Sequence, residues 1–356
     1  MTRDIYKNVV VMGLKMNFSF IFILCMILLA GCKEGGSGIG KNITGKAGEI
    51  VVVISNNYWE GETGKLLRDN LEQEHVALPQ DEPLFDLINV PPEAFTSIFK
   101  TTRNILQVKI SSTVDSTGVF LNKDVWASPQ TVVIIQVRNA GELKELFEEE
   151  KEKIMAVFLQ AEKERLTYNY DKYYEKSVFN VLNRDFNFIM KLPPGFRTAK
   201  QEKDFIWFRY ETPDISQGIV IYTFPYISDS TFTVNYLVNV RDSVLKENVS
   251  GPTEDSYMST EKRVEQIFNI REHNGNYASE MRGLWRLIND YMGGPYISLE
   301  VLDISNRRVI AVFGYVYAPS KDKRNYLRQV EAMVYSLKLN NQAENDKINS
   351  QIKMGN

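Results

Sequence analysis

The sequence predicts an α+β protein built from two mixed α/β domains with largely antiparallel sheets, joined by a long helix. Runs of β-branched residues alternate with amphipathic segments, which is typical of packed sheets and helices. A stretch of about forty residues after Gly141 contains neither Pro nor a further Gly, as a long helix requires. The 356 residues suit two domains at roughly 150 residues each.

The first domain is expected over residues 49–140. It opens with "EIVVVIS" (49–55), a continuous β-branched run typical of a buried strand. The Pro91-Pro92 pair can start a helix, which is expected over 93–102. Composition predicts a further helix over 61–74 and strands over 84–90, 105–112 and 131–138.

The long helix is expected over residues 141–185, with a possible break near Asn169. Phe147, Ile154, Ala161 and Tyr168 recur every seven residues. This spacing predicts one buried stripe, with the charged run "EEEKEK" on the opposite, solvated face. We expect the helix to cross from the first domain to the second.

The second domain is expected over residues 186–339. Its predicted elements are a strand, a Pro-Pro-Gly turn and a strand within 187–211, a strand over 218–226, a helix over 230–249, a hairpin of 296–303 and 308–318, and a helix from about 321. The last helix places Leu327, Val330, Val334 and Leu337 on one face. Residues 278–292 fit either a short helix or a strand. We expect residues 340–356 to form a disordered tail.

The N-terminus has the pattern of an export signal. Basic residues precede an apolar run from Phe18 to Ala30, which is shorter than the roughly 20 residues of a membrane-spanning helix. Leu29-Ala30-Gly31-Cys32 resembles the bacterial lipobox. The resemblance implies cleavage after residue 31 of a signal peptide spanning 1–31, and acylation of Cys32. Residues 32–48 are rich in Gly and are expected to be a tether between lipid and body.

Composition limits the chemistry of the mature chain. Removal of residues 1–31, which hold three basic residues and one acidic residue, changes the net charge from −3 to −5. A mildly acidic chain is not expected to bind nucleic acid. The two cysteines are Cys25, in the signal peptide, and Cys32, so no thiol remains for catalysis. His75 and His273 lie far apart in the sequence and are expected on the surface, so we expect neither a metal site nor a cofactor.

One local cluster is a candidate binding site. If residues 280–288 are helical, Arg282 and Arg286 share a face, Trp285 adjoins it, and Asp290 follows one turn later. Such a cluster can recognise an anionic group or a carbohydrate. The alternative is an arginine pair bridged by carboxylates within a domain. No catalytic residues are assigned.

Three short motifs, each an Asp followed by a Ser, match the O-glycosylation signal of some Gram-negative envelopes. They predict exposed hydroxyl groups at Ser116, Ser230 and Ser243. The aromatic segment "FIWFRY" (205–210) can stack on sugar rings, although its alternation also fits a strand with a core face.

The mature chain resembles an uncharacterised family of Gram-negative lipoproteins, a domain of unknown function. The resemblance is carried by "RGLWRLINDYMGGPY" (282–296) and "VFGYVYAPSKDKRNYLRQVEAMVYSL" (312–337). The second half also resembles the α/β/α sandwiches of the PsbP and Mog1 type. We therefore expect a protein held on the bilayer through acylated Cys32, in the cell envelope and at its outer membrane, with palmitate among its acyl chains. Its expected role is binding or scaffolding, with another envelope protein or a glycan as partner. The alternative is an envelope hydrolase acting on carbohydrate or peptidoglycan.

Overall fold

The computed structural model describes residues 41–340. The predicted signal peptide, Cys32 and nearly all of the predicted tail lie outside the described residues. Over residues 41–340, no helix has the length and apolar composition needed to cross a membrane. The ordered body begins earlier than Glu49, because Thr44 donates its backbone N–H to Thr101 and accepts one from Arg103. Residues 42–48 are therefore attached to the first domain, although they were expected in the tether.

The first domain contains a five-stranded sheet in the order β2-β1-β3-β5-β4. Its elements are β1 (Glu49–Val53), α2 (Asn56–Trp59), α3 (Glu62–Leu71), β2 (Asp86–Val90), a 3₁₀ turn (Pro92–Ala94), α4 (Ser97–Lys100), β3 (Asn104–Ile110), β4 (Gly118–Lys123) and β5 (Thr131–Val137). Three of its strand pairs are parallel and only β4 is antiparallel to its neighbour. The helix predicted over 93–102 is reduced to two short turns.

Helix α5 (Ala140–Lys172) is the long helix that the sequence predicts, and it lies beside α3. It begins where the Asn139 side chain accepts a hydrogen bond from the N–H of Glu142 (3.0 Å), as an N-cap should. Phe147, Ile154 and Ala161 are buried as predicted, but Tyr168 is 67% exposed. The seven-residue repeat fails there because it drifts about 20° per heptad on a straight helix. Tyr170 is buried instead, in the core of the second domain.

Helix α5 ends just after the break predicted near Asn169. The chain is extended at Tyr173 and continues as α6 (Lys176–Val181) and a π-turn (Leu182–Phe186). The predicted helix of residues 141–185 is therefore two helices.

The second domain is an eight-stranded, wholly antiparallel sheet in the order β10-β12-β13-β14-β9-β8-β7, with β11 also paired to β12. Its elements are β6 (Phe188–Ile189), β7 (Arg197–Glu202), β8 (Phe205–Glu211), β9 (Ser216–Pro225), a 3₁₀ turn (Asp229–Phe232), α7 (Val234–Asn248), β10 (Tyr257–Thr260), β11 (Ile267–His273), β12 (Asn276–Ile288), β13 (Gly293–Asp303), a 3₁₀ turn (Ile304–Asn306), β14 (Arg308–Tyr317), α8 (Arg324–Val334) and β15 (Lys338–Leu339). Strands β6 and β15 pair in a separate two-stranded sheet. The α+β class, with a long helix between the two large sheets, is confirmed.

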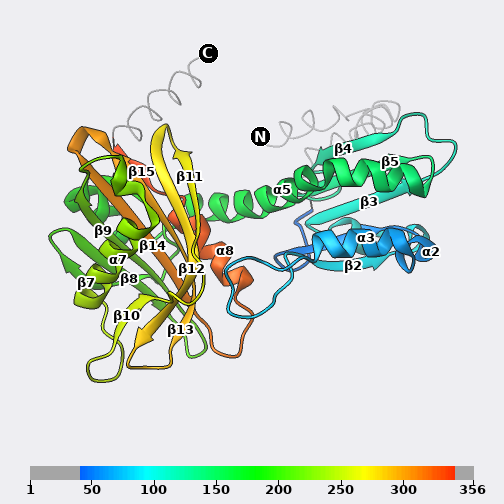
Figure 1. Cartoon of the computed structure of the whole chain (residues 1–356). Helices are drawn as coiled ribbons and strands as arrows, with labels where there is room; N and C mark the ends of the chain where they lie inside the picture. The colour runs from blue at the N-terminus through cyan, green and yellow to red at the C-terminus, as the bar shows by residue number, and fades with distance from the viewer. Residues whose placement is uncertain (1–40, 341–356) are drawn as a thin grey trace, which may run out of the picture. The chain divides into compact units, whose positions relative to one another are not determined.

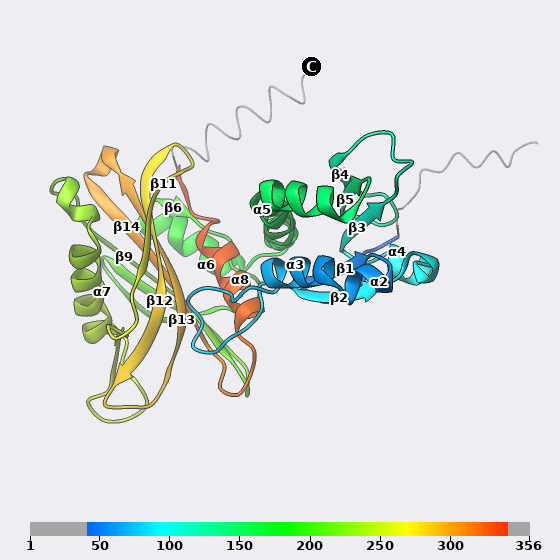
Figure 2. The ribbon, with the colours of Figure 1, turned by 45° about the vertical axis from the view of Figure 1, so that its right-hand side comes forward.

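Helices cover both faces of this sheet, α7 on one side and α8 on the other (Figures 1 and 2). Alternate residues of each strand pack into two separate cores, as the two-residue period of a strand dictates. Trp285 belongs to the core under α7, and Leu327 and Val330 belong to the core under α8. All four residues predicted on one face of the last helix are fully buried.

Candidate functional site

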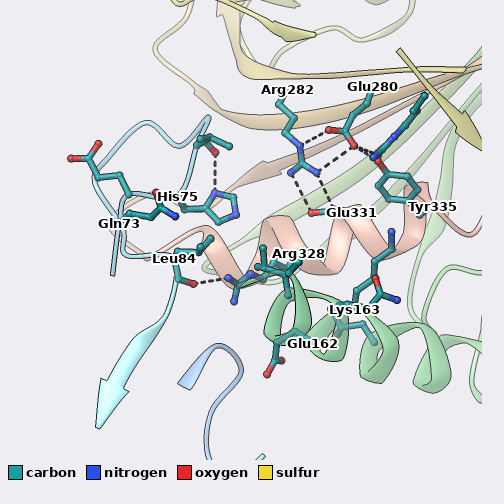
Figure 3. A pocket seen from close by; sticks show the side chains of 17 residues that line it. Gln73, His75, Leu84, Glu162, Lys163, Glu280, Arg282, Arg328, Glu331 and Tyr335 are labelled. Carbon is teal, nitrogen blue, oxygen red and sulfur yellow. Dashed lines mark hydrogen bonds and ion pairs between the residues drawn. The ribbon is translucent and has the colours of Figure 1, made fainter. Parts of the chain in front are cut away.

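A polar cavity of about 480 Å³ lies where α5 and α8 meet the strands β11 and β12 and the loop between α3 and β2 (Figure 3). We call it the polar pocket and define it by the residues His75, Leu84, Glu162, Lys163, Arg271, Glu280, Arg282, Arg328, Glu331 and Tyr335. Its volume is within the range that small-molecule sites occupy. Because both cationic and anionic side chains line the pocket, its charge depends on which of them form ion pairs with one another.

Arg282 is the centre of an ion-pair network on one wall of the polar pocket. Its Nε donates to Glu280 Oε1 (2.8 Å), and its Nη2 donates to Glu331 Oε1 (2.9 Å). Arg271 Nη1 and the Tyr335 hydroxyl also donate to Glu280 (Figure 3). Burial opposes the ionisation of Glu331, but the Arg282 guanidinium outweighs it and holds the pKa of that carboxyl below its ordinary value. The charges of this wall therefore neutralise one another.

Lys163 differs from the other cations of the pocket. Its ammonium lies 3.7 Å from the centroid of the Tyr335 ring, and among the described residues it has no hydrogen-bond or ion-pair partner. Burial lowers the pKa of Lys163, and the charges that act on it most are two carboxylates, Glu331 and Glu280, and two guanidinium groups, Arg271 and Arg282. Because these four charges balance, the Lys163 charge is a surplus.

Arg328 adds positive charge from the floor of the pocket. Its Nη2 donates to the carbonyl of Leu84 (2.6 Å), while its Nε and Nη1 are buried without a hydrogen-bond partner. Burial lowers the pKa of Arg328 to about 10, and neighbouring Arg324 acts in the same direction. The guanidinium remains charged at neutral pH, but its unpartnered N–H groups are shielded from solvent, so it acts on a ligand through its field.

His75 supplies an uncharged hydrogen-bonding group. Burial and, to a smaller extent, the Arg328 charge lower the pKa of His75 to about 4. Nδ1 lies 2.9 Å from the carbonyl oxygen of Val76, which can only accept, so Nδ1 carries the proton. The lone pair of Nε2 is then free to accept a hydrogen bond from a ligand.

The residues of the cluster predicted around Arg282 do not lie together. Residues 276–288 form strand β12, so the helical alternative is wrong. Arg282 faces the polar pocket, but Trp285 lies on the opposite face of the sheet, 2% exposed. Arg286 is 3.8 Å from Glu261. Asp290, in the turn after the strand, accepts from Thr253 Oγ1 (3.0 Å).

The second predicted set of residues concerns surface hydroxyl groups. Ser116, Ser230 and Ser243 are all exposed, as the motif requires.

The surface position expected for His273 is wrong, because His273 is only 8% exposed and its Nε2 lies 2.7 Å from the carbonyl oxygen of Leu337. Within residues 41–340, no three His, Cys, Asp or Glu side chains come together as a metal site.

Sequence reasoning missed Lys163 and Glu331, and it expected His75 on the surface, whereas His75 is half-buried and lines the pocket. The sequence did contain a pattern that predicts a polar face on α8. Polar side chains follow one another there at spacings of four, three and four residues, namely Arg324, Arg328, Glu331 and Tyr335. This spacing places a polar stripe beside the apolar one. No pattern in the sequence connects this stripe to Lys163 in α5 or to His75.

Two family models match consecutive parts of the chain. Residues 43–171 match the family model DUF8532, and residues 175–336 match the family model DUF4837, both described as domains of unknown function. No curated protein matches the chain.

Two solved structures are similar to part of the chain. The Ran-binding protein Mog1p of Saccharomyces cerevisiae aligns with 9% identity and a TM-score of 0.30, over 43% of this chain and 90% of that chain. A mutant of protein Mog1 aligns with 9% identity and a TM-score of 0.27 over the same shares. Both are of the Mog1 type that the second half was expected to resemble, and at these scores the likeness supports no conclusion about function. Two consecutive parts of the chain, residues 43–171 and 175–336, are thus each similar to a family described only as a domain of unknown function.

Proposed function

We propose that this chain is a lipid-anchored cell-envelope protein that acts by binding, and that the polar pocket takes a small anionic ligand. The anchor is Cys32, at the end of the lipobox-like Leu29-Ala30-Gly31-Cys32. The observation that carries the ligand assignment is the unpaired, half-buried ammonium of Lys163.

The charge balance of the pocket favours an anion over a cation. Holding an ammonium away from water without a counter-ion is unfavourable, and the Glu280 and Glu331 carboxylates are already engaged by Arg282. An anion beside Lys163 supplies the missing charge. The buried Arg328 adds to the positive potential without needing direct contact.

The neutral His75 restricts the class of ligand further. Because its Nε2 can accept, the preferred anion also carries a hydrogen-bond donor. Hydrogen phosphate has both features at neutral pH, since it presents charged oxygens to Lys163 and one hydroxyl to His75. A carboxylate with a neighbouring hydroxyl group has the same two features.

Calorimetric titration with inorganic phosphate tests this proposal. We expect saturable binding to the wild type, and a loss of affinity of about tenfold or more in Lys163→Met, which corresponds to about 1.4 kcal/mol or more. Lys153→Met is the matched control on α5, because Lys153 is 74% exposed in its side chain and pairs with Glu150. Equal phosphate affinities of the wild type and Lys163→Met would refute the ligand assignment.

The alternative of an envelope hydrolase finds less support in the polar pocket. A glycoside hydrolase needs a carboxylic acid that stays protonated to donate to the leaving group. The pKa of Glu331 is lowered instead. Burial raises the pKa of Glu300, but Glu300 is 1% exposed in the sheet beneath α7 and does not line this cavity.

A further inference from the structure

A second cavity, of about 470 Å³, lies at the end of the eight-stranded sheet where α7 stops at Asn248. Beyond that residue the helix no longer covers the strands, and the cavity opens over their ends. We call it the aromatic pocket. The rings that line it come from three strands: Trp207 (β8), Trp285 (β12), and Tyr315 with Tyr317 (β14).

These rings are held in fixed positions. Trp207 Nε1 donates to the Tyr315 hydroxyl (3.1 Å), and Trp285 Nε1 donates to the carbonyl of Val316 (3.1 Å). Gly218 leaves room for the Tyr315 ring, since a Cβ at this position would lie 2.1 Å from it. Both indole N–H groups are therefore satisfied within the protein and are not available to a ligand.

The hydrogen-bonding groups of the aromatic pocket lie mainly on one wall. Residues 209–216, at the end of β8 and the start of β9, supply Arg209, Glu211 and Asp214. Arg209 is already paired with Glu211, although its buried Nε has no hydrogen-bond partner, and Asp214 lies 3.9 Å from the ammonium of Lys321. This wall therefore has more acceptors than free donors. The opposite wall is apolar and includes Met258, Leu287 and Met292.

We propose that the aromatic pocket binds an uncharged aromatic ring that carries a hydrogen-bond donor, of the phenol type. The apolar wall and the fixed rings accept a flat apolar group in edge-to-face contact, and the thioethers of Met258 and Met292 adapt to its shape. The acceptor-rich wall receives the donor and offers few free donors to an anion. This pocket is separate from the polar pocket in position and in chemistry.

A sugar ring fits these observations less well. Stacking on a sugar requires an open aromatic face, but Trp207 is 8% exposed and the Arg209 guanidinium covers its ring at 4.9 Å from the centroid. Trp285 is 2% exposed and packs edge-to-face against Tyr315, with ring centroids 5.3 Å apart. The burial of Trp207 also confirms that "FIWFRY" is a strand with a core face.

The test is a calorimetric titration of the full chain with three probes: 4-methylphenol, 4-methylbenzoate and methyl β-glucoside. We expect 4-methylphenol to bind with one-to-one stoichiometry in the millimolar range, which is typical of a ligand with so few atoms. The benzoate, which has the same ring but a negative charge, should bind at least about tenfold more weakly. The glucoside should not bind.

Two variants locate the binding. Ser250→Trp adds a ring from an exposed position at the mouth of the aromatic pocket and should abolish phenol binding without disturbing the core. Tyr317→Ala should weaken it. Tyr291→Ala is the control, because Tyr291 is fully exposed and outside the pocket. Tighter binding of the glucoside or the benzoate, no saturation by 4-methylphenol, or undiminished binding in Ser250→Trp would each overturn the proposal.

Discussion

The charged side chains of this protein differ in how completely they are compensated. Arg282 lies between Glu280 and Glu331 and is fully paired. Lys163 has a ring beneath it and no counter-ion. Since a half-buried charge is stable only with a partner or with water, this contrast distinguishes a structural ion pair from a group available to a ligand.

His75 should make folding stability depend on pH. The folded chain keeps it neutral down to a pKa of about 4, compared with an ordinary value of 6.5. Between these values the unfolded chain binds more protons, so stability is fully present above about pH 6.5 and falls as the pH drops toward 4. Urea unfolding at pH 7 and pH 5 should show a smaller loss for His75→Gln than for the wild type. An identical loss in both proteins would contradict the burial of His75.

Arg241 of α7 should be essential for stability. It is 0% exposed, donates to the Tyr296 hydroxyl (2.9 Å), and its charge lowers the raised pKa of buried Glu300. Arg241→Met should cost about 3 kcal/mol or more because it leaves Glu300 uncompensated, and adding Glu300→Gln should restore part of the loss. Arg263→Met, at an exposed arginine, should change stability by less than about 0.5 kcal/mol. Equal costs in the two single variants, measured by urea unfolding, would argue against this role.

At the scale of elements, α8 connects the two domains. Its apolar stripe packs into the sheet, while its N-terminus is held by Glu82 of the first domain. The Glu82 carboxylate accepts from the backbone N–H groups of Lys323 (2.6 Å) and Arg324 (2.7 Å). Arg324 in turn donates to Asp86 (2.6 Å). A helix N-terminus capped by a carboxylate from the other domain makes folding of one domain depend on the other.

Removal of this cap should destabilise the chain. Glu82 is 4% exposed, and Glu82→Ala leaves two buried N–H groups without an acceptor, at a cost of about 1–3 kcal/mol. Glu93→Ala, at an exposed residue of the same domain, is the control and should be nearly neutral. Thermal unfolding of both variants measures the difference. A melting temperature of Glu82→Ala equal to that of the control would show that the cap contributes nothing.

Elements with strong periodicity could be predicted from the sequence, and elements whose partners are distant could not. The stripe of Leu327, Val330 and Val334 is buried as predicted, because the period of the apolar residues, which is a local property, decides which face of a helix packs against the core. Residues 278–292 fit two structures, and pairing with β10, β11 and β13 made this segment a strand. The polar pocket was not predictable, because its residues come from four distant segments and no local pattern shows that these segments meet.

At the scale of the whole molecule, the proposed anchor determines where the body works. Acyl chains contribute about 0.8 kcal/mol for each buried CH₂, so several chains on Cys32 hold the protein durably on a bilayer. Labelling of cells with a fatty acid should mark the wild type, and Cys32→Ala should be unlabelled and released from the membrane fraction. An unlabelled wild type, or a labelled Cys32→Ala, would contradict the proposed anchor.

The central claim is that the polar pocket holds a cation without a counter-ion, to which an anion binds. Measuring the pKa of Lys163 tests this claim most directly. Nuclear magnetic resonance of the lysine side chains can follow this pKa in the free protein and at saturating phosphate. The account predicts a pKa below the ordinary 10.5 in the free protein and a rise when phosphate is bound. A pKa at or above 10.5 that phosphate leaves unchanged would contradict it.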